Sequence, residues 1–374
     1  MAKVRVTNPF KPTAGAEPPV LAGREKVIRD FSDGLAEGPG APGRLMRISG
    51  PRGSGKTVLL TELGEIAKDE GWLVVDETAR KGLVSAVVDR LAGSAPDASV
   101  CADIDLGFVK ARAGVSTREC GTDLRSALAA AIARPGRKGV LVTVDEVQDA
   151  DRDDMTQIAH AVQHMIREGR DVAFVFAGLT TGVADFVNGQ AMTFLRRAKA
   201  EQLNAIPDDE VAHALKEPFA GTGMHLSDEA LEAAVRAADG YAYLVQLVGY
   251  NVWRAARRHF AETPAVSMED VADGVDMALA NYDEAVIEPA LAMLSERAMR
   301  YLVEMAKRDG DAATGDIAKS IGVPATSLSS ARRTLIARQV IEPAGRRGYV
   351  RFSVPKMREY VSAHADDLLS RYDA

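Results

Sequence analysis

Cysteine, long apolar runs and aromatic residues are all scarce in this sequence of 374 residues. The two cysteines, Cys101 and Cys120, show no CxxC or CxxH spacing, which argues against a disulfide framework or a zinc site. No apolar run is long enough to span a bilayer, and the opening MAKVRVTNPF lacks the apolar segment of a secretory signal. We therefore expect neither signal peptide nor membrane contact, and a location in the reducing cytoplasm.

Aromatic residues make up only 5% of the chain, so Ala, Val and Leu supply most of its 47% hydrophobic content, which favours helices. Charged residues account for 26%, as in ordinary globular proteins. A chain of 374 residues is too long for one ordinary core. We therefore predict two or three domains.

An excess of positive charge is also lacking, because 46 Lys and Arg stand against 53 Asp and Glu and the formal net charge is −7. That value alone argues against a nucleic-acid partner. From Leu294 to Tyr360, however, thirteen Lys and Arg stand against seven Asp and Glu. This uneven distribution predicts a basic functional segment near the C-terminal end.

Strand and helix patterns alternate up to about residue 206, after a Pro- and Gly-rich arm. Apolar, β-branched runs predict strands at RLMRISG, WLVVDE, GVLVTVDE and DVAFVFAG, with a shorter one at AEQLNAI. Helices are expected at 24–35, 56–70, 79–92, 124–134 and 153–169. The alternation predicts an α/β fold with a parallel sheet in three layers. The segment 97–119 shows no pattern that we interpret.

The pattern changes twice beyond residue 207. Helices are expected at 208–219, 227–238, 241–260 and 267–283. The last eighty residues then predict three helices, with Thr314 capping the second and Pro324 leading into the third, and two short strands around Gly-Arg-Arg-Gly. This is the winged-helix order. We predict an ATP-binding core with the N-terminal arm at 1–206, a helical lid at 207–290 and a winged helix-turn-helix at 291–374.

A glycine-rich loop follows the first predicted strand and fits the pattern G-x-x-x-x-G-K-[ST]. It consists of Gly50, Pro51, Arg52, Gly53, Ser54, Gly55, Lys56 and Thr57. The glycines let backbone N–H groups turn inward around phosphates, and the helix starting at Lys56 presents its positive end to them. Lys56 would reach the β- and γ-phosphates, and the Thr57 hydroxyl would bind Mg²⁺. The strand before the loop and the helix after it favour nucleotide binding over a chance glycine turn.

Two acidic residues end the third predicted strand. Asp145 can hold Mg²⁺ through water, and Glu146 can polarise the attacking water as a general base. An ordinary acidic turn is the alternative. GTPases of the Ras type lack an acidic base here, so we predict ATP hydrolysis. His160 and His164, four apart on a predicted helix, have no third ligand in the sequence, and we expect no metal site there.

Four segments together, VLAGRE at 20–25, GPRGSGKT, VTVDEVQDA and FVFAGLTTG, resemble AAA+ ATPases of the initiator-like branch, which includes origin-recognition proteins and many bacterial and archaeal switch ATPases. The resemblance extends to about residue 355. It implies that the backbone at Val20, Leu21 and Arg24 lines the adenine pocket. It also implies that the strand DVAFVFAG lies between the loop strand and the Asp145 strand.

Three further roles follow from the resemblance. Thr180, with Thr181 as second choice, would orient the attacking water, although the family often has Asn there and an ordinary turn residue is the alternative. Arg196 or Arg197 would be an arginine finger for a neighbouring subunit, which implies nucleotide-dependent self-association; a solvated helix face is the alternative. The family's γ-phosphate-sensing arginine is replaced here by Tyr241, Tyr243 and Gln246, which implies a slow ATPase.

The third helix of the predicted winged helix would enter a DNA major groove, with Ser330 and Arg333 among its outward residues. Arg346 and Arg347 at the wing tip could reach phosphates or the minor groove. Between Ala325 and Arg358 there are eight Lys and Arg and one acid, which favours double-stranded DNA as the partner. We predict an ATP- and Mg²⁺-dependent switch that controls DNA binding. The alternative is a signalling or defence ATPase whose winged helix docks proteins; a metabolic kinase is less favoured because no second substrate domain is apparent.

Overall fold

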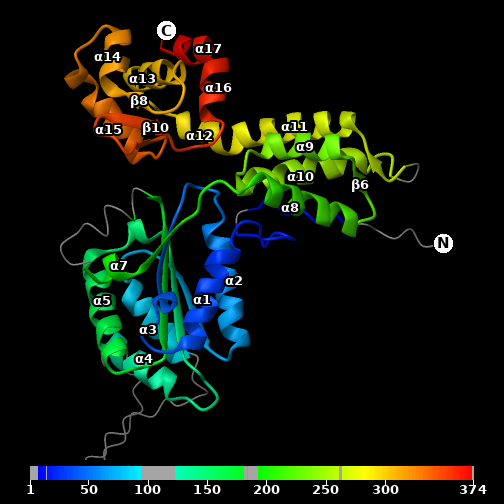
Figure 1. Cartoon of the computed structure of the whole chain (residues 1–374). Coiled ribbons are helices and arrows are strands. Elements are labelled where there is room, and N and C mark those ends of the chain that lie inside the picture. Colours follow the sequence, from blue (N-terminus) through cyan, green and yellow to red (C-terminus); the bar gives the residue numbers. More distant parts are fainter. Residues whose placement is uncertain are drawn as a thin grey trace, which may run out of the picture. The chain divides into compact units, whose positions relative to one another are not determined.

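The computed structural model describes residues 7–13, 15–93, 123–180, 183, 193–260 and 263–372. The two cysteines, Thr181 and the segment 97–119 lie outside these residues. The chain forms two compact units (Figure 1). The sheet unit comprises Glu25–Ser49 and Lys56–Gln202, and the helical unit comprises the chain up to Arg24, Gly50–Gly55 and the chain from Leu203 onward. The division into three domains remains a prediction.

The sheet unit is built on a parallel sheet. Within the described residues, its five strands have the order β2–β3–β4–β1–β5. The strands are β1 (Leu45–Ser49), β2 (Leu73–Thr78), β3 (Val140–Asp145), β4 (Val172–Gly178) and β5 (Lys199–Gln202). The predicted place of the strand at 171–178, between the loop strand and the Asp145 strand, is therefore confirmed.

Helices cover this sheet in two groups. They are α1 (Glu25–Glu37), α2 (Lys56–Asp69), α3 (Leu83–Gly93), α4 (Leu124–Ile132), α5 (Arg152–Arg167) and α7 (Thr193–Arg197), with short turns η1 (Pro42–Arg44) and η2 (Val147–Asp149). One group consists of α1 and α2, and the other of α3, α4 and α5 (Figure 1). The result is the expected α/β architecture with helices on a parallel sheet.

The central strands β3 and β4 are apolar and buried nearly throughout, as a sheet covered on both faces requires. They are parallel neighbours, so their carboxyl ends lie at the same edge of the sheet. This register brings Asp145, the last residue of β3, and Glu146, which follows it, to the same edge as Leu179 and Thr180, after β4.

The helical unit contains α8 (Asp208–Gly221), α9 (Asp228–Ala238), α10 (Ala242–Ala256) and α11 (Met268–Tyr282), with a pair of strands, β6 (His225–Leu226) and β7 (Ala265–Val266). The side chains of Ser227 and Ser267 cap α9 and α11. The N-terminal arm is fastened to this unit, because the Phe10 ring lies 5.3 Å from the Phe219 ring and fills the space beside Gly249.

The C-terminal part follows through η3 (Asp283–Ile287) and α12 (Glu288–Leu291). It comprises α13 (Glu296–Ala306), β8 (Ala312–Ala313), α14 (Thr314–Ile321), η4 (Ala325–Leu328), α15 (Ser329–Ala337), β9 (Ile341–Pro343), β10 (Tyr349–Phe352), α16 (Met357–Ala363) and α17 (Ala365–Ser370). The strands form an antiparallel sheet of order β8–β10–β9.

Two sequence predictions about the C-terminal helices need correction. Thr314 does not cap α14: Ala313 occupies the cap position, and the Thr314 hydroxyl lies 3.1 Å from that of Tyr301. The third helix is shorter than expected, because η4 forms a separate turn and α15 begins only at Ser329. Strand β8, which also pairs with β10, was not predicted.

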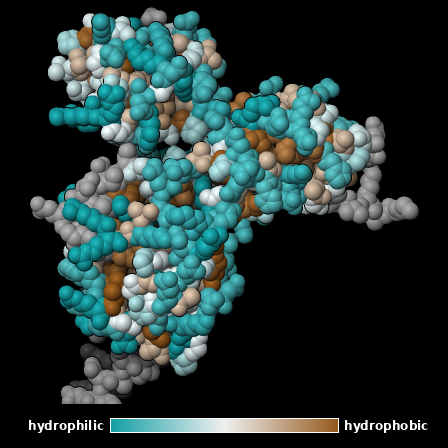
Figure 2. All heavy atoms as spheres, viewed as in Figure 1, coloured by the Kyte–Doolittle hydropathy of each residue, from teal (hydrophilic) through white to brown (hydrophobic). Residues whose placement is uncertain are grey.

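The surface seen in Figure 2 is mainly hydrophilic. Among the described residues, the exposed large hydrophobic side chains are those of Ile166, Met268, Met277 and Met293. No helix in the described part of the chain combines the length and apolar character of a membrane span.

Candidate functional site

The predicted phosphate loop lies in the helical unit up to Gly55 and continues into α2 at Lys56. Gly53 and Gly55 have φ of 71° and 89°, a region that favours glycine. Lys56 is only 6% exposed. Among the described residues, the buried Ser54 hydroxyl finds no hydrogen-bond partner. These features fit a loop that binds the phosphates of a nucleotide.

Thr57 and Asp145, far apart in the sequence, meet in the sheet unit. The Thr57 hydroxyl donates a hydrogen bond of 2.5 Å to Asp145 Oδ2. Both residues line a cavity of about 300 Å³, together with Asp76 and Thr143. Hydroxyl and carboxylate oxygens suit Mg²⁺, which binds through few protein ligands and completes its shell with water and phosphate. The pair therefore fits the metal, although its role as a ligand set remains a prediction.

Glu146 follows Asp145 in an unusual backbone conformation, with φ of 52° in the left-handed region. Such conformations in non-glycine residues concentrate at functional sites. The Glu146 N–H donates to Asp145 Oδ1 at 2.8 Å, and the Glu146 carboxylate accepts a hydrogen bond from the Gln148 side-chain amide. Gln148 Oε1 in turn accepts from the Leu179 N–H at 3.1 Å.

Gln148 was missed by the sequence analysis, although it stands only two residues after the predicted base. It connects the carboxylate of Glu146 to the end of the neighbouring strand, β4, and so restricts the position of that carboxylate. Thr180, partly buried, directly follows Leu179 and lies at the same sheet edge. Its role in orienting water remains a prediction.

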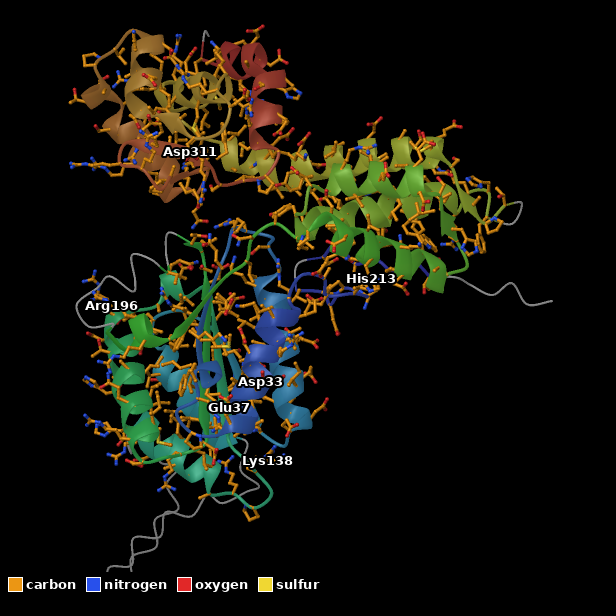
Figure 3. All side chains as sticks on the ribbon, in the orientation of Figure 1. Asp33, Glu37, Lys138, Arg196, His213 and Asp311 are labelled. Carbon is orange, nitrogen blue, oxygen red and sulfur yellow. The ribbon has the colours of Figure 1, made fainter. Side chains whose placement is uncertain are left out.

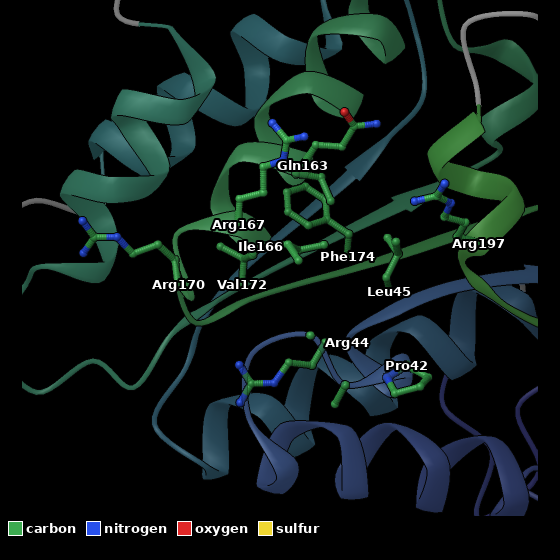
Figure 4. Close-up of a pocket in the computed structure, with 13 residues that line it drawn as sticks. Pro42, Arg44, Leu45, Gln163, Ile166, Arg167, Arg170, Val172, Phe174 and Arg197 are labelled. Atoms are coloured by element: carbon green, nitrogen blue, oxygen red, sulfur yellow. The ribbon is translucent and has the colours of Figure 1, made fainter.

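Arg196 and Arg197 both lie exposed on α7, as Figure 3 shows for Arg196. Arg197 lines a cavity of about 530 Å³ together with Arg44, Arg167 and Arg170 (Figure 4). This cavity shares no lining residue with the one at Thr57 and Asp145. The exposed Arg197 side chain is open to a neighbouring molecule, as a finger would require, and that role remains a prediction.

Several residues of the helical unit contact the phosphate loop through its carbonyl groups. Arg24, which is 5% exposed, donates from Nη2 to the Ser54 carbonyl at 3.0 Å. The Tyr241 hydroxyl donates to the Arg52 carbonyl, and the Tyr243 N–H donates to the Gly53 carbonyl at 3.2 Å. Val20 and Leu21, the other predicted base-pocket residues, are partly buried. None of these contacts with the loop carbonyls was predicted from the sequence.

The predicted DNA-contacting residues are all exposed. Ser330 and Arg333 lie on α15, and Arg346 and Arg347 lie between β9 and β10. The Arg346 guanidinium stacks 4.5 Å above the Tyr349 ring. Their contacts with DNA remain predictions.

Other basic residues of the C-terminal part are bound within the protein. Arg351 pairs with Glu342 at 2.6 Å and Lys356 pairs with Asp239 at 2.9 Å. Arg358 pairs with Asp309, and Arg338 donates to the Ala292 carbonyl at 2.6 Å. In the described part of the chain, four arginines around α15 and the β9–β10 turn form no salt bridge: Arg332, Arg333, Arg346 and Arg347.

Comparison with protein families assigns two segments. Residues 20–175 match the family model of the AAA ATPase domain, and residues 284–361 match a domain of unknown function (DUF8462). None of the curated proteins compared with the chain matches it.

Among solved structures, the Aeropyrum pernix ORC2 protein, determined as ADPNP-ADP complexes, has a TM-score of 0.59 and 15% identity, covering 96% of this chain and 97% of that chain. Cdc6p from Pyrobaculum aerophilum has a TM-score of 0.50 and 16% identity, covering 96% and 97%. These identities establish shared fold and no more. The chain therefore has the fold of these ORC2 and Cdc6 proteins, and its residues 20–175 are similar to the AAA ATPase domain.

Proposed function

We propose that this chain is an ATP-binding and slowly ATP-hydrolysing switch whose nucleotide state controls double-stranded DNA binding through a C-terminal winged helix. The hydrogen bond from Thr57 to Asp145 is the observation that carries the nucleotide half of the proposal. It brings the end of the phosphate-loop motif to the acidic end of β3. The match to the AAA ATPase domain and the nucleotide complexes of the similarly folded ORC2 protein also support nucleotide binding by this chain.

In this proposal, Gly50–Gly55 and Lys56 bind the phosphates, while Thr57 and Asp145 hold Mg²⁺. When bound, Mg²⁺ neutralises charge on the β- and γ-phosphates. The buried Lys56 ammonium lies on a helix N-terminus and adds positive charge to that end. The loop therefore favours a polyanion over a neutral ligand.

Glu146 acts as the general base in the proposed hydrolysis. Gln148 holds its carboxylate by one amide hydrogen bond and leaves the other carboxylate oxygen to accept a proton from water. Helix α10 has no basic residue at its start, where Tyr241 and Tyr243 stand, and the first basic residue of this helix is Arg254. This composition supports slow turnover.

The DNA half of the proposal rests on the C-terminal part. The order α13, α14, α15 and the β9–β10 strand pair supports a winged helix with α15 as the groove-binding helix. Arg333, Arg346 and Arg347 are exposed and form no salt bridge in the described residues, so they can neutralise DNA phosphates.

A contact within the helical unit supports the coupling of the two halves. Arg52 of the phosphate loop donates from Nε to Gln339 Oε1 at 3.0 Å. Gln339 comes two residues after the end of α15. A movement of the Arg52 side chain on nucleotide binding would therefore act on the segment that directly follows α15.

A protein partner for the C-terminal part is the second candidate. It is favoured by the observation that four of the eight basic residues there are already bound within the protein. The remaining surface charge is modest for a DNA-binding module, in a chain of net charge −7. Binding to duplex DNA separates the two candidates.

Nucleotide binding and turnover by the full chain test the first half of the proposal. Lys56→Ala should abolish ATP binding, because it removes the main positive charge from the phosphates. Glu146→Gln should bind ATP as the wild type does and lose hydrolysis, because an amide cannot accept the proton. Normal turnover by Glu146→Gln would show that another group is the base.

A further inference from the structure

The carbonyl side of the phosphate loop is the feature that the proposed function leaves unexplained. A loop that turns its N–H groups toward phosphates turns carbonyl groups the other way, and buried carbonyls need donors. Three consecutive carbonyls, those of Arg52, Gly53 and Ser54, each receive a hydrogen bond from outside the loop. The donors are the Tyr241 hydroxyl, the Tyr243 N–H and the Arg24 guanidinium.

The Tyr241 donor is held rigidly. Its side chain is 6% exposed, and its ring meets the fully buried Tyr282 ring edge-on at 5.8 Å. The Tyr282 hydroxyl donates to the Pro355 carbonyl at 3.0 Å, which fixes that ring in turn. Gly240, just before Tyr241, accepts a hydrogen bond of 2.8 Å from the Ile206 N–H.

The fit between Tyr241 and the loop is close. A Cβ atom at Gly53 would collide with the Tyr241 hydroxyl, so this glycine serves the tyrosine contact as well as the loop conformation. Burial raises the pKa of Tyr241 far above its ordinary value, so the hydroxyl keeps its proton and remains a donor at neutral pH.

The second side-chain donor is equally constrained. Arg24 also donates from Nη1 to the Gly23 carbonyl at 2.8 Å. The Gly23 N–H donates to Glu210 Oε2 on α8 at 2.6 Å. Two of the three loop carbonyls are thus bound to side chains that are themselves anchored in the helical unit, and Gly50–Gly55 belong to that unit rather than to the sheet unit.

We propose that Tyr241 is a positioning residue for the phosphate loop: with Arg24 and the Tyr243 N–H, it holds the loop carbonyls outward, so that the loop N–H groups face the phosphates before a nucleotide arrives. This inference rests on the proposed nucleotide binding. Tyr241 holds a backbone carbonyl and not a phosphate oxygen, so its effect on ADP and on ATP is the same. A γ-phosphate sensor would affect ATP alone.

The test compares Tyr241→Phe with the wild type in the full chain, by titration with fluorescent Mg-ADP and a non-hydrolysable Mg-ATP analogue at a temperature where circular dichroism shows both folded. Tyr241→Phe keeps the buried ring and removes only the donor. We expect both dissociation constants to rise by a similar factor of about ten, the effect of losing the part-buried hydrogen bond to the Arg52 carbonyl. Tyr250→Phe, on the same helix, is the control and should leave both constants unchanged, because no hydrogen bond of its hydroxyl is found in the described residues.

Three results would overturn the proposal. Unchanged binding of both nucleotides by Tyr241→Phe would show that the loop keeps its conformation without this donor. Weaker binding of the ATP analogue alone would make Tyr241 a γ-phosphate sensor instead. A wild-type chain that binds neither nucleotide would overturn the proposed function, and the positioning role with it.

Discussion

Replacement of both Arg346 and Arg347 by Ala should weaken DNA binding and make it less sensitive to salt. The two side chains are exposed in the turn between β9 and β10, and neither forms a salt bridge in the described residues. Each cation that meets a phosphate releases condensed counterions from DNA, so affinity falls as salt rises. Because phosphate contacts carry no base information, the loss should be similar for all duplex sequences.

The size of the effect follows from the unpaired cations. Arg332, Arg333, Arg346 and Arg347 lie around α15 and the β9–β10 turn without carboxylate partners in the described residues, which gives a slope of log affinity against log salt of about −3.6 if all four meet phosphates. Removal of two leaves about −1.8. Between 50 and 200 mM salt, wild-type affinity should therefore fall about 150-fold and that of the double variant about 12-fold.

Fluorescence anisotropy with a labelled duplex across this salt range measures both slopes. A matched control replaces Arg257 and Arg258, an adjacent exposed pair just after α10, by Ala, and so changes the net charge equally. The control should keep the wild-type slope. Equal slopes for the wild type and the Arg346/Arg347 double variant would refute the assignment of the wing as a phosphate contact.

Two further predictions concern hydrolysis. Gln148→Leu should lower kcat about tenfold with little change in ATP affinity, because Glu146 loses the amide that orients it. An unchanged kcat in a steady-state ATPase assay would show that the Glu146 carboxylate does not need this hydrogen bond. Arg197→Ala or Arg196→Ala should lower ATPase activity without weakening ATP binding. Mixing either variant with a Lys56→Ala chain should restore activity, because the Lys56→Ala chain supplies its own arginine to the neighbouring variant. The arginine-finger role would be contradicted if mixing restored no activity and light scattering showed the chain to be a monomer in both nucleotide states.

The fold of the sheet unit followed closely from local patterns. Runs such as GVLVTVDE and DVAFVFAG are apolar and β-branched throughout, and only a strand covered on both faces accommodates them. The strand order, with β4 between β1 and β3, came from the family resemblance rather than from periodicity. The helix ends differ by a few residues, since capping decides them: at α14, Ala313 and not Thr314 holds the cap position.

The contacts of the candidate site were harder to predict, because they join distant residues. Thr57 and Asp145 could be paired in advance, since the loop motif and an acidic strand end occur together in nucleotide-binding folds. Nothing in the sequence near Tyr241 indicates that its hydroxyl reaches the Arg52 carbonyl, 189 residues away. The Gln148 bridge to the Leu179 N–H likewise depends on the register of β3 and β4.

The salt bridges of the C-terminal part were likewise hard to predict from the sequence. A count of basic residues from Ala325 to Arg358 treats all eight as available to DNA. In the structure, Arg351 pairs with Glu342, and Lys356 pairs with Asp239, a residue at the end of α9 that is remote in sequence. Charge composition therefore indicated the basic segment, and only the folded chain indicates which of its cations remain unpaired.

The central claim is that the bound nucleotide controls DNA binding, and one measurement tests it most directly. The affinity of the full chain for duplex DNA is measured by anisotropy at one salt concentration, with saturating Mg-ADP and with a non-hydrolysable Mg-ATP analogue, and with Lys56→Ala as the control. For a nucleotide-controlled switch, the wild-type dissociation constant should differ between the two nucleotides by at least about fivefold, the lower end of typical allosteric coupling, and Lys56→Ala should show no difference. Equal DNA affinity of the wild type in both nucleotide states, or no binding in either, would contradict it.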